Sequence, residues 1–169
     1  MTARERALAR ERAIAREVLD LQEGRGAVPL LDTSAARELL RGARRIAVVG
    51  ASPDPMRPSN GVMAYLLAHG YDCVPVNPTT LEVLGRHTFP DVRSATEAGG
   101  GFDIVDVFRR PEATPDVARD AVAAGAGALW LQLGIVSWEA ARIASEAGMP
   151  VVMDRCTEIE HAALRARNG

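Results

Sequence analysis

Apolar residues follow two different patterns along this chain. Near the N-terminus they recur at helical spacing, as at Leu8, Ile14 and Val18, among Ala, Arg and Glu residues that favour helix. This spacing predicts one helix over residues 2–22. Farther along, short runs of four or five apolar residues alternate with amphipathic segments, and this second pattern predicts strands alternating with helices.

The second pattern covers the chain after Gly42 and predicts an α/β fold with a mainly parallel sheet between two layers of helices. Its apolar runs are rich in β-branched residues, which is typical of strands buried on both faces. The expected strands are residues 46–49, 73–76, 103–108, 128–131 and 151–153. The expected helices are residues 60–69, 112–124, 138–147 and 157–167. Residues 77–93 are expected to be irregular apart from a short β segment near Val83, and Gly99–Gly101 to form a flexible joint.

The chain divides into two parts in this interpretation. Residues 1–42 are a helical extension, and residues 43–169 are the α/β domain. A second helix is expected to follow the cap-forming stretch Asp32–Ser34 and to stop at Gly42. The apolar stripe of the first helix has two interpretations. We expect it to pack on the domain, and the alternative is contact with a second copy of the chain or with another protein partner.

Composition removes several classes of function. All 20 basic side chains are Arg, so the chain lacks the lysine that a Schiff-base enzyme or a Walker-type phosphate loop needs. A net charge of -2 and 4% aromatic residues argue against nucleic-acid binding. Two cysteines are too few for a disulfide framework or a four-cysteine zinc site, and they fit a reducing cytoplasm. No apolar run is long enough to cross a membrane.

Candidate chemistry lies at the strand ends. In an open parallel sheet, ligands bind outside the carboxyl ends of the strands. The segments that follow the five predicted strands are Gly50-Ala51-Ser52-Pro53, Asn77-Pro78, Phe108-Arg109-Arg110-Pro111, Gln132-Leu133-Gly134 and Asp154-Arg155-Cys156. Each segment taken alone is more often a turn than a site, so their common position at one edge carries the argument.

The segment after the first strand is suited to a phosphate group. Gly50 allows a tight turn, and Ser52 offers a hydroxyl and an amide. The helix expected from about Ser59 or Asn60 presents free N–H groups and the positive end of its dipole. Arg57 can add a permanent bidentate contact. The segment is not G-x-G-x-x-G. It therefore suits a phosphate-bearing nucleotide and is less like the loop with which dinucleotide-binding proteins usually hold their cofactor.

The segment after the second strand argues against a nicotinamide cofactor. NAD-binding proteins usually carry Asp or Glu there to hold the ribose hydroxyls. Here the strand ends at Val76 and is followed by Asn77-Pro78, and the next carboxylate is Glu82. A rigid turn is the structural interpretation of Asn77-Pro78.

Six segments, in order, resemble those of the small bacterial and archaeal CoA-binding proteins, which are similar to the CoA-binding Rossmann domain of the succinyl-CoA synthetase α subunit. The segments are IAVVGAS at 46–52, RPS at 57–59, VPVNP at 74–78, VDVFRRP at 105–111, LWLQLG at 129–134 and VVMDRC at 151–156. The resemblance implies a Rossmann-like three-layer fold that holds coenzyme A. It does not extend to the N-terminal helices.

The resemblance also implies where coenzyme A lies. Its diphosphate would lie near Ala51, Ser52 and Arg57, its adenosine near Val76-Asn77-Pro78, and its pantetheine arm would run past Phe108-Arg109 toward Gln132-Leu133-Gly134. The cofactor-binding residues expected on this basis are Gly50, Ala51, Ser52, Arg57, Pro58, Val76, Asn77, Pro78, Phe108, Arg109, Gln132 and Gly134. Arg110 is also a candidate, but we expect it to be solvated before the proline.

The expected function is binding of CoA or acyl-CoA without stand-alone catalysis. None of His69, His87 and His161 falls at a strand end, and no cluster of metal-ligand residues is evident. The alternatives are an NAD(P)-binding oxidoreductase-type protein and an accessory subunit of an acyl-CoA synthetase. Cys156 has two interpretations: a small residue at a strand–helix junction, which we favour, or a thiol whose pKa the helix start and Arg155 lower for disulfide exchange with CoA.

Overall fold

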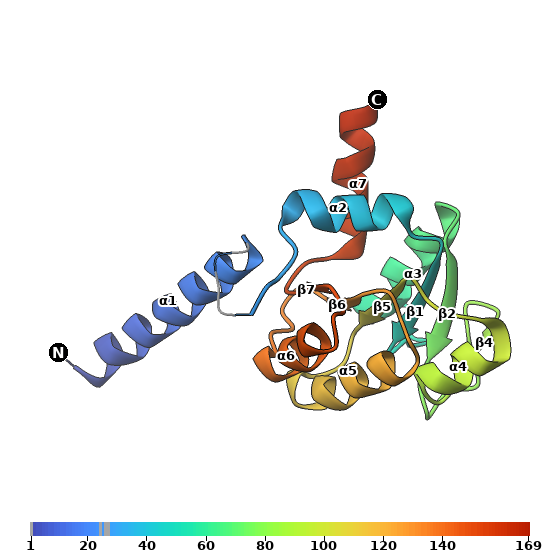
Figure 1. Ribbon diagram of the computed structural model, residues 1–169, viewed down its shortest axis with the longest axis horizontal. Coiled ribbons are helices and arrows are strands. Elements are labelled where there is room, and N and C mark those ends of the chain that lie inside the picture. The colour runs from blue at the N-terminus through green and yellow to red at the C-terminus, as the bar shows by residue number, and fades with distance from the viewer. Residues whose placement is uncertain (1, 24, 26–27) are drawn as a thin grey trace.

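Five parallel strands form the central sheet of the computed structural model, which describes residues 2–23, 25 and 28–169 (Figure 1). The strand order is β2-β1-β5-β6-β7. The strands are β1 (Arg45–Val49), β2 (Asp72–Val76), β5 (Ile104–Val107), β6 (Leu129–Leu131) and β7 (Val151–Val152). A separate two-stranded hairpin joins β3 (Glu82–Val83) to β4 (Arg86–His87). The α/β fold with a parallel sheet is therefore confirmed.

Helices cover both faces of the sheet, so the fold has three layers. On one face lie α2 (Thr33–Gly42), α3 (Pro58–Ala68) and α7 (Thr157–Asn168). On the other lie α4 (Val92–Gly99), α5 (Thr114–Ala123), which follows the short 3-10 helix η1 (Pro111–Ala113), and α6 (Trp138–Glu146). Figure 1 shows α2 on one side of the sheet and α5 and α6 on the opposite side.

Two apolar clusters, one on each face, hold the layers together. Because side chains alternate along a strand, Ile46 and Val48 of β1 pack toward α2, α3 and α7, whereas Ala47 and Val49 pack toward α4 and α5. Trp130 of β6 is fully buried in the cluster on the face covered by α2, α3 and α7. Its indole N–H donates to the Arg155 carbonyl at 2.8 Å. Both faces of the sheet are dry, which explains why its strands have continuous apolar runs.

Helix α4 was not expected, and the interpretation of Gly99–Gly101 as a flexible joint is wrong. The Asp91 side chain accepts from the Ser94 amide at 2.7 Å and caps the helix, while Val92 and Ala95 are buried. Gly99 is the last helical residue, and Gly100 follows with φ of 99° and donates its amide to Thr96. These glycines therefore end a helix that only one turn of apolar residues anchors.

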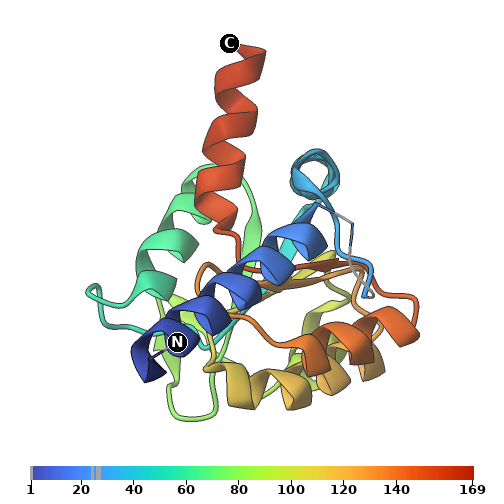
Figure 2. The same ribbon diagram turned by 90° about the vertical axis from the view of Figure 1, so that its left-hand side faces the viewer.

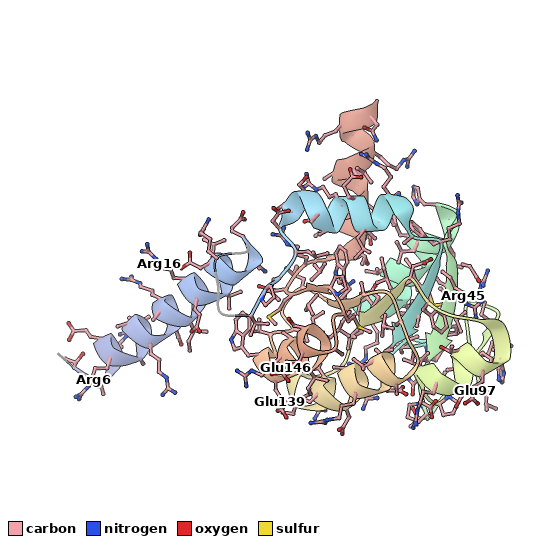
Figure 3. The ribbon with its side chains drawn as sticks, in the orientation of Figure 1. Arg6, Arg16, Arg45, Glu97, Glu139 and Glu146 are labelled. Atoms are coloured by element: carbon pink, nitrogen blue, oxygen red, sulfur yellow. The ribbon has the colours of Figure 1, made fainter. Side chains whose placement is uncertain are left out.

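Helix α1 (Ala3–Gln22) stands away from the body of the molecule, so the expectation that it packs along the domain is wrong for most of its length. Figures 1 and 2 show it projecting from the end of the sheet beside β7. Arg6 and Arg16 point into open space in Figure 3. In the described part of the helix, the contacts with the domain lie near its C-terminal end: Val18 is buried, and the side-chain amide of Gln22 donates to the Met153 carbonyl at 2.8 Å.

Helix α2, in contrast, is part of the packed layer. Ala36 and Leu40 are fully buried beneath it, and the Arg37 guanidinium lies 2.8 Å from a carboxylate oxygen of Glu160 on α7. The segment before α2 also joins the fold, because the Leu31 amide donates to the Val151 carbonyl at 2.8 Å. Helix α2 therefore belongs to the packed layer of helices, although the expected boundary at residue 42 places it in the N-terminal extension.

No helix among the residues that the structure describes has both the length and the apolar character needed to cross a lipid bilayer.

Deletion of residues 2–22 should leave the domain folded and lower its free energy of unfolding by less than about 2 kcal/mol, because Val18 alone is apolar and buried among the side chains that the structure describes in this segment. Leu40→Ala should lower it by about 2–5 kcal/mol, because it leaves a cavity beneath α2. Urea unfolding followed by the fluorescence of buried Trp130 measures both. A deletion more damaging than Leu40→Ala would contradict the account of α1 as a peripheral helix.

Candidate functional site

The candidate site lies where neighbouring strands send the chain to opposite faces of the sheet. From β1 the chain continues into α3 on one face, and from β5 it continues into α5 on the other. Because β1 and β5 are adjacent, their carboxyl-end loops part and leave a crevice between them. The loops beginning at Gly50 and Phe108 form the two sides of this crevice.

Gly50 makes a close backbone approach between these two loops. It adopts φ of 84°, and a Cβ atom at this position would lie 2.9 Å from the Phe108 carbonyl oxygen and 3.2 Å from Cδ of Arg109. The Gly50 amide donates to the Val76 carbonyl at 2.9 Å, so the turn is also tied to β2. Both the conformation and the space therefore require glycine at this residue.

The loop from Gly50 to α3 is held by hydrogen bonds within itself. The Ser52 amide donates to Oγ of Ser59 at 3.1 Å, and Nδ2 of Asn60 donates to the Ser52 carbonyl at 3.0 Å. The helix begins one or two residues earlier than expected, with Pro58 at its first position and Arg57 as the N-cap residue. Ser59 and Asn60 are buried, so they fix the loop in place beside the first turn of α3.

A cavity of about 670 Å³ opens at this crevice, a volume within the range of small-molecule sites. It brings together nine of the twelve residues expected to bind the cofactor: Gly50, Ser52, Arg57, Pro58, Asn77, Pro78, Phe108, Arg109 and Gln132. It is also lined by six residues outside that set: Ser59, Val62, Thr79, Leu133, Ile135 and Cys156. All five strand-end segments therefore contribute to one cavity, the fifth through Cys156.

The cavity carries two arginines that have no acidic partner in the described part of the chain. No carboxylate there lies within 4.0 Å of a guanidinium nitrogen of Arg57 or Arg109, although ten such contacts involve other arginines. Arg57 comes from the start of α3, and Arg109 comes from the opposite loop. Two unpaired guanidinium groups on facing sides of a cavity favour a ligand with phosphate groups. Arg110 is exposed and does not line the cavity, as expected for a solvated residue.

Ala51, Val76 and Gly134 do not line this cavity. Ala51 is fully buried, and its carbonyl accepts from Nδ2 of Asn77 at 2.8 Å. Val76 lines a neighbouring cavity of about 530 Å³, which shares Pro78 and Arg109 with the first. Gly134 is held by Asp154, whose Oδ1 accepts the Gly134 amide at 2.6 Å. These contacts shape the loops that surround the cavity.

A buried polar network lies behind the cavity. Asp106, in the middle of β5, is fully buried and accepts from Nε2 of Gln132 at 2.7 Å and from Oγ1 of Thr157 at 3.0 Å. Nε2 of Gln132 also donates to Oγ1 of Thr157 at 2.8 Å. Burial raises the pKa of Asp106 to about 7, although hydrogen bonds from Gln132 and Thr157 oppose the shift.

Asp106 and Thr157 are not among the residues predicted from the strand ends. An acidic residue inside an apolar strand that is buried on both faces is rare, because an unpaired carboxylate is costly there. Asp106 within the run 104–107 was therefore a usable signal. Thr157 gave no comparable signal, because a threonine at a helix start has an ordinary capping role.

Cys156 is the N-cap residue of α7 and lies half-buried at the edge of the cavity. Burial raises its thiol pKa, whereas the amides of Ile159 and Glu158 at the helix start lower it to a smaller extent. Arg155 is engaged with Glu160, whose carboxylate lies 3.7 Å away. The hypothesis of a lowered Cys156 pKa is therefore wrong, and the interpretation as a junction residue fits the structure.

The histidines lie away from this cavity. His69 and His161 line a separate cavity of about 330 Å³, and His87 lies in the exposed hairpin. Nδ1 of His69 lies 2.7 Å from the Tyr65 carbonyl, and Nε2 lies 2.7 Å from a guanidinium nitrogen of Arg165. Burial, together with His69 and Arg165, lowers the pKa of His161.

This architecture defines the class of the protein as a Rossmann-like α/β domain with a cavity at the switch in its strand order. A model of the CoA binding domain family matches residues 44–162. The chain therefore belongs to the CoA-binding domain family, which confirms the resemblance seen in the sequence. Helices α1 and α2 precede the matched residues.

Similar proteins support this family assignment. The uncharacterized protein YneT of Bacillus subtilis strain 168 is 41% identical over 129 residues, which cover 76% of this chain and 93% of YneT. A hypothetical protein of Pyrococcus horikoshii OT3 is 41% identical and superimposes with a TM-score of 0.75 over 80% of this chain and 93% of that one. The dinucleotide-forming acetyl-coenzyme A synthetase 1 of Ca. Korarchaeum cryptofilum is 27% identical, with a TM-score of 0.53, over 63% of this chain and 25% of the synthetase.

Gly50→Ala should destabilise the domain by at least about 2 kcal/mol, because the new Cβ meets the Phe108 carbonyl and the backbone has a positive φ. Gly61→Ala is the matched control. That position in α3 has no atom within 4 Å of the new Cβ, and alanine should stabilise the helix by about 0.5–1 kcal/mol. Equal effects of the two substitutions in urea unfolding would contradict the close approach.

The thiol of Cys156 should react with an aromatic disulfide at pH 8 more slowly than glutathione does, because its pKa is raised and less thiolate is present. The difference in reaction rate between the wild type and Cys156→Ser isolates this thiol from buried Cys73. A rate above that of glutathione would restore the redox hypothesis.

Proposed function

We propose that this protein binds coenzyme A or acyl-CoA in the 670 Å³ cavity, without catalysing a reaction on its own. The observation that carries the proposal is the pair of arginines, Arg57 and Arg109, which have no acidic partner among the described residues and lie on facing sides of a cavity in a member of the CoA-binding domain family. CoA carries a diphosphate and a ribose 3′-phosphate. Guanidinium groups recognise such oxygens through charge-assisted, bidentate hydrogen bonds.

The three parts of the cofactor are proposed to follow the three parts of the site. The diphosphate lies at Ser52, Arg57 and the first turn of α3, where the positive end of the helix dipole favours an anion. The adenosine lies over Asn77-Pro78, where the neighbouring 530 Å³ cavity begins. The pantetheine arm passes Phe108 toward Gln132. Leu133, which is 62% exposed at the cavity edge, offers apolar contact to an acyl group.

The alternative of a nicotinamide cofactor has less support. The side chain at the end of β2 is Asn77, whose Oδ1 accepts from the amide and the hydroxyl of Thr79, both at 2.9 Å. Its Nδ2 donates to the Ala51 carbonyl. Asn77 therefore serves the turn, and it offers no carboxylate to the ribose hydroxyls of NAD.

An accessory role beside an acyl-CoA synthetase partner is the second candidate function. Its support is the likeness to one part of the Korarchaeum synthetase. A partner would have to supply the acyl-transfer chemistry, because no histidine is among the cavity-lining residues in the described part of the chain. The exposed Leu8 and Ile14 of α1 offer an apolar surface for such a protein or for a second copy.

We also propose that the protein works in a reducing compartment such as the cytoplasm. The support is that Cys73 and Cys156 are both free thiols, and that burial raises the pKa of Cys73 to about 12.

Isothermal titration calorimetry should show binding of CoA to the wild type, and Arg57→Met should weaken it by at least about tenfold through loss of a charged hydrogen bond. Arg16→Met, on the projecting part of α1 in Figure 3, is the matched control and should change the affinity less than twofold. Titrations with NADH and NADPH complete the comparison. Tighter binding of either nicotinamide cofactor than of CoA would overturn the proposal.

A further inference from the structure

The amide of Gln132 has a defined direction. Gln132 is 4% exposed, and it lines the 670 Å³ cavity on one side while contacting Asp106 and Thr157 on the other. Both of these partners are fully buried. Only Gln132 therefore connects the polar network to the cavity.

The donors and acceptors of the network can be counted. An ionised Asp106 only accepts, so it requires a donor at each of its two contacts. The Thr157 hydroxyl donates its single hydrogen to Oδ2 of Asp106, and its oxygen can then only accept from Gln132. Nε2 of Gln132 donates one hydrogen to Asp106 and the other to Thr157. With both amide hydrogens used inside the network, Oε1 is the atom that Gln132 has left for the cavity.

We propose that Gln132 is a specificity residue of this cavity, and that its Oε1 accepts a hydrogen bond from an amide N–H or the thiol S–H of the pantetheine arm. Asp106 and Thr157 act as positioning residues that prevent the amide from turning over. This inference rests on the proposed function, because it takes the pantetheine arm as the ligand at Gln132. It adds which ligand groups the site accepts: a donor is favoured at this point, and an acceptor such as a carbonyl oxygen is disfavoured.

The energetic reason lies in the location of the network. A buried polar group that loses its partner keeps the full cost of its desolvation. Turning the amide over would place Oε1 of Gln132 against two groups that have no hydrogen to offer it. The network can thus hold one orientation in a surrounding of apolar residues, with Val48 and Trp130 as the strand neighbours of Asp106.

The ligand test compares CoA with adenosine 3′,5′-bisphosphate, which has phosphates on the same nucleoside but lacks the arm. Titrations are run at pH 8.5, above the pKa of about 7 of Asp106, so that this carboxyl is ionised.

Gln132→Met should weaken CoA binding about tenfold, because one hydrogen bond to the arm is lost. Asp106→Asn should weaken it similarly, because asparagine offers both a donor and an acceptor. Thr157→Val should have a smaller effect, about threefold, because Asp106 still requires the Gln132 amide as donor. Binding of the armless nucleotide should change less than twofold in all three.

A second measurement observes the amide without any ligand. In ¹⁵N-labelled protein, the side-chain amide hydrogens of Gln132, identified by their loss in Gln132→Met, should exchange slowly with solvent in the wild type. They should exchange faster in Asp106→Asn, where the amide can turn toward the water-filled cavity. Fast exchange in the wild type would overturn the fixed direction.

The remaining outcomes separate the two proposals. Equal weakening of CoA and of the armless nucleotide by the variants would assign the network a structural role only and would overturn this inference alone. Unchanged CoA binding in Gln132→Met would do the same. A wild type that binds neither CoA nor the bisphosphate would overturn the proposed function, and with it the ligand assigned to Gln132.

Discussion

The site depends on the close approach between the ends of β1 and β5. These adjacent strands send their connections to opposite faces of the sheet, so a crevice forms only at their carboxyl ends. Gly50 allows the two loops to meet, because any side chain there would press on the Phe108 carbonyl. This single contact sets the distance between the start of α3 and the loop that carries Arg109. The cavity, its two unpaired arginines and the position of Gln132 all follow from that arrangement.

The polar network of Asp106, Gln132 and Thr157 is the second constraint on the site. A carboxyl in the middle of a parallel sheet costs stability unless its neighbours satisfy it. Here two neutral side chains do so, from the next strand and from the start of α7. Because burial disfavours the charged form, the pKa of Asp106 rises to about 7, although both hydrogen bonds oppose the shift. The two hydrogen bonds that satisfy Asp106 also fix the direction of the Gln132 amide beside the cavity.

Much of this could be predicted from the sequence, for identifiable reasons. The strands were predictable because both faces of the sheet are dry, which makes runs such as 46–49 continuously apolar. The loops at the site were predictable because parallel strands share one carboxyl edge. Helix α4 was missed because it has only 8 residues and buries only two of them, so its periodicity is too short to detect. The hydrogen bonds of Gln132 require the strand register and side-chain directions, which local patterns do not contain. The position of α1 depends on contacts near its C-terminal end, such as the one from Gln22 to Met153.

The crevice between β1 and β5 is proposed to hold the phosphates and the arm of coenzyme A. A crystal structure of the protein grown with CoA tests it most directly. Electron density for the diphosphate is expected within hydrogen-bond distance of the Arg57 guanidinium, with the arm reaching Gln132. Density for CoA elsewhere on the protein, with the crevice occupied by water, would contradict it.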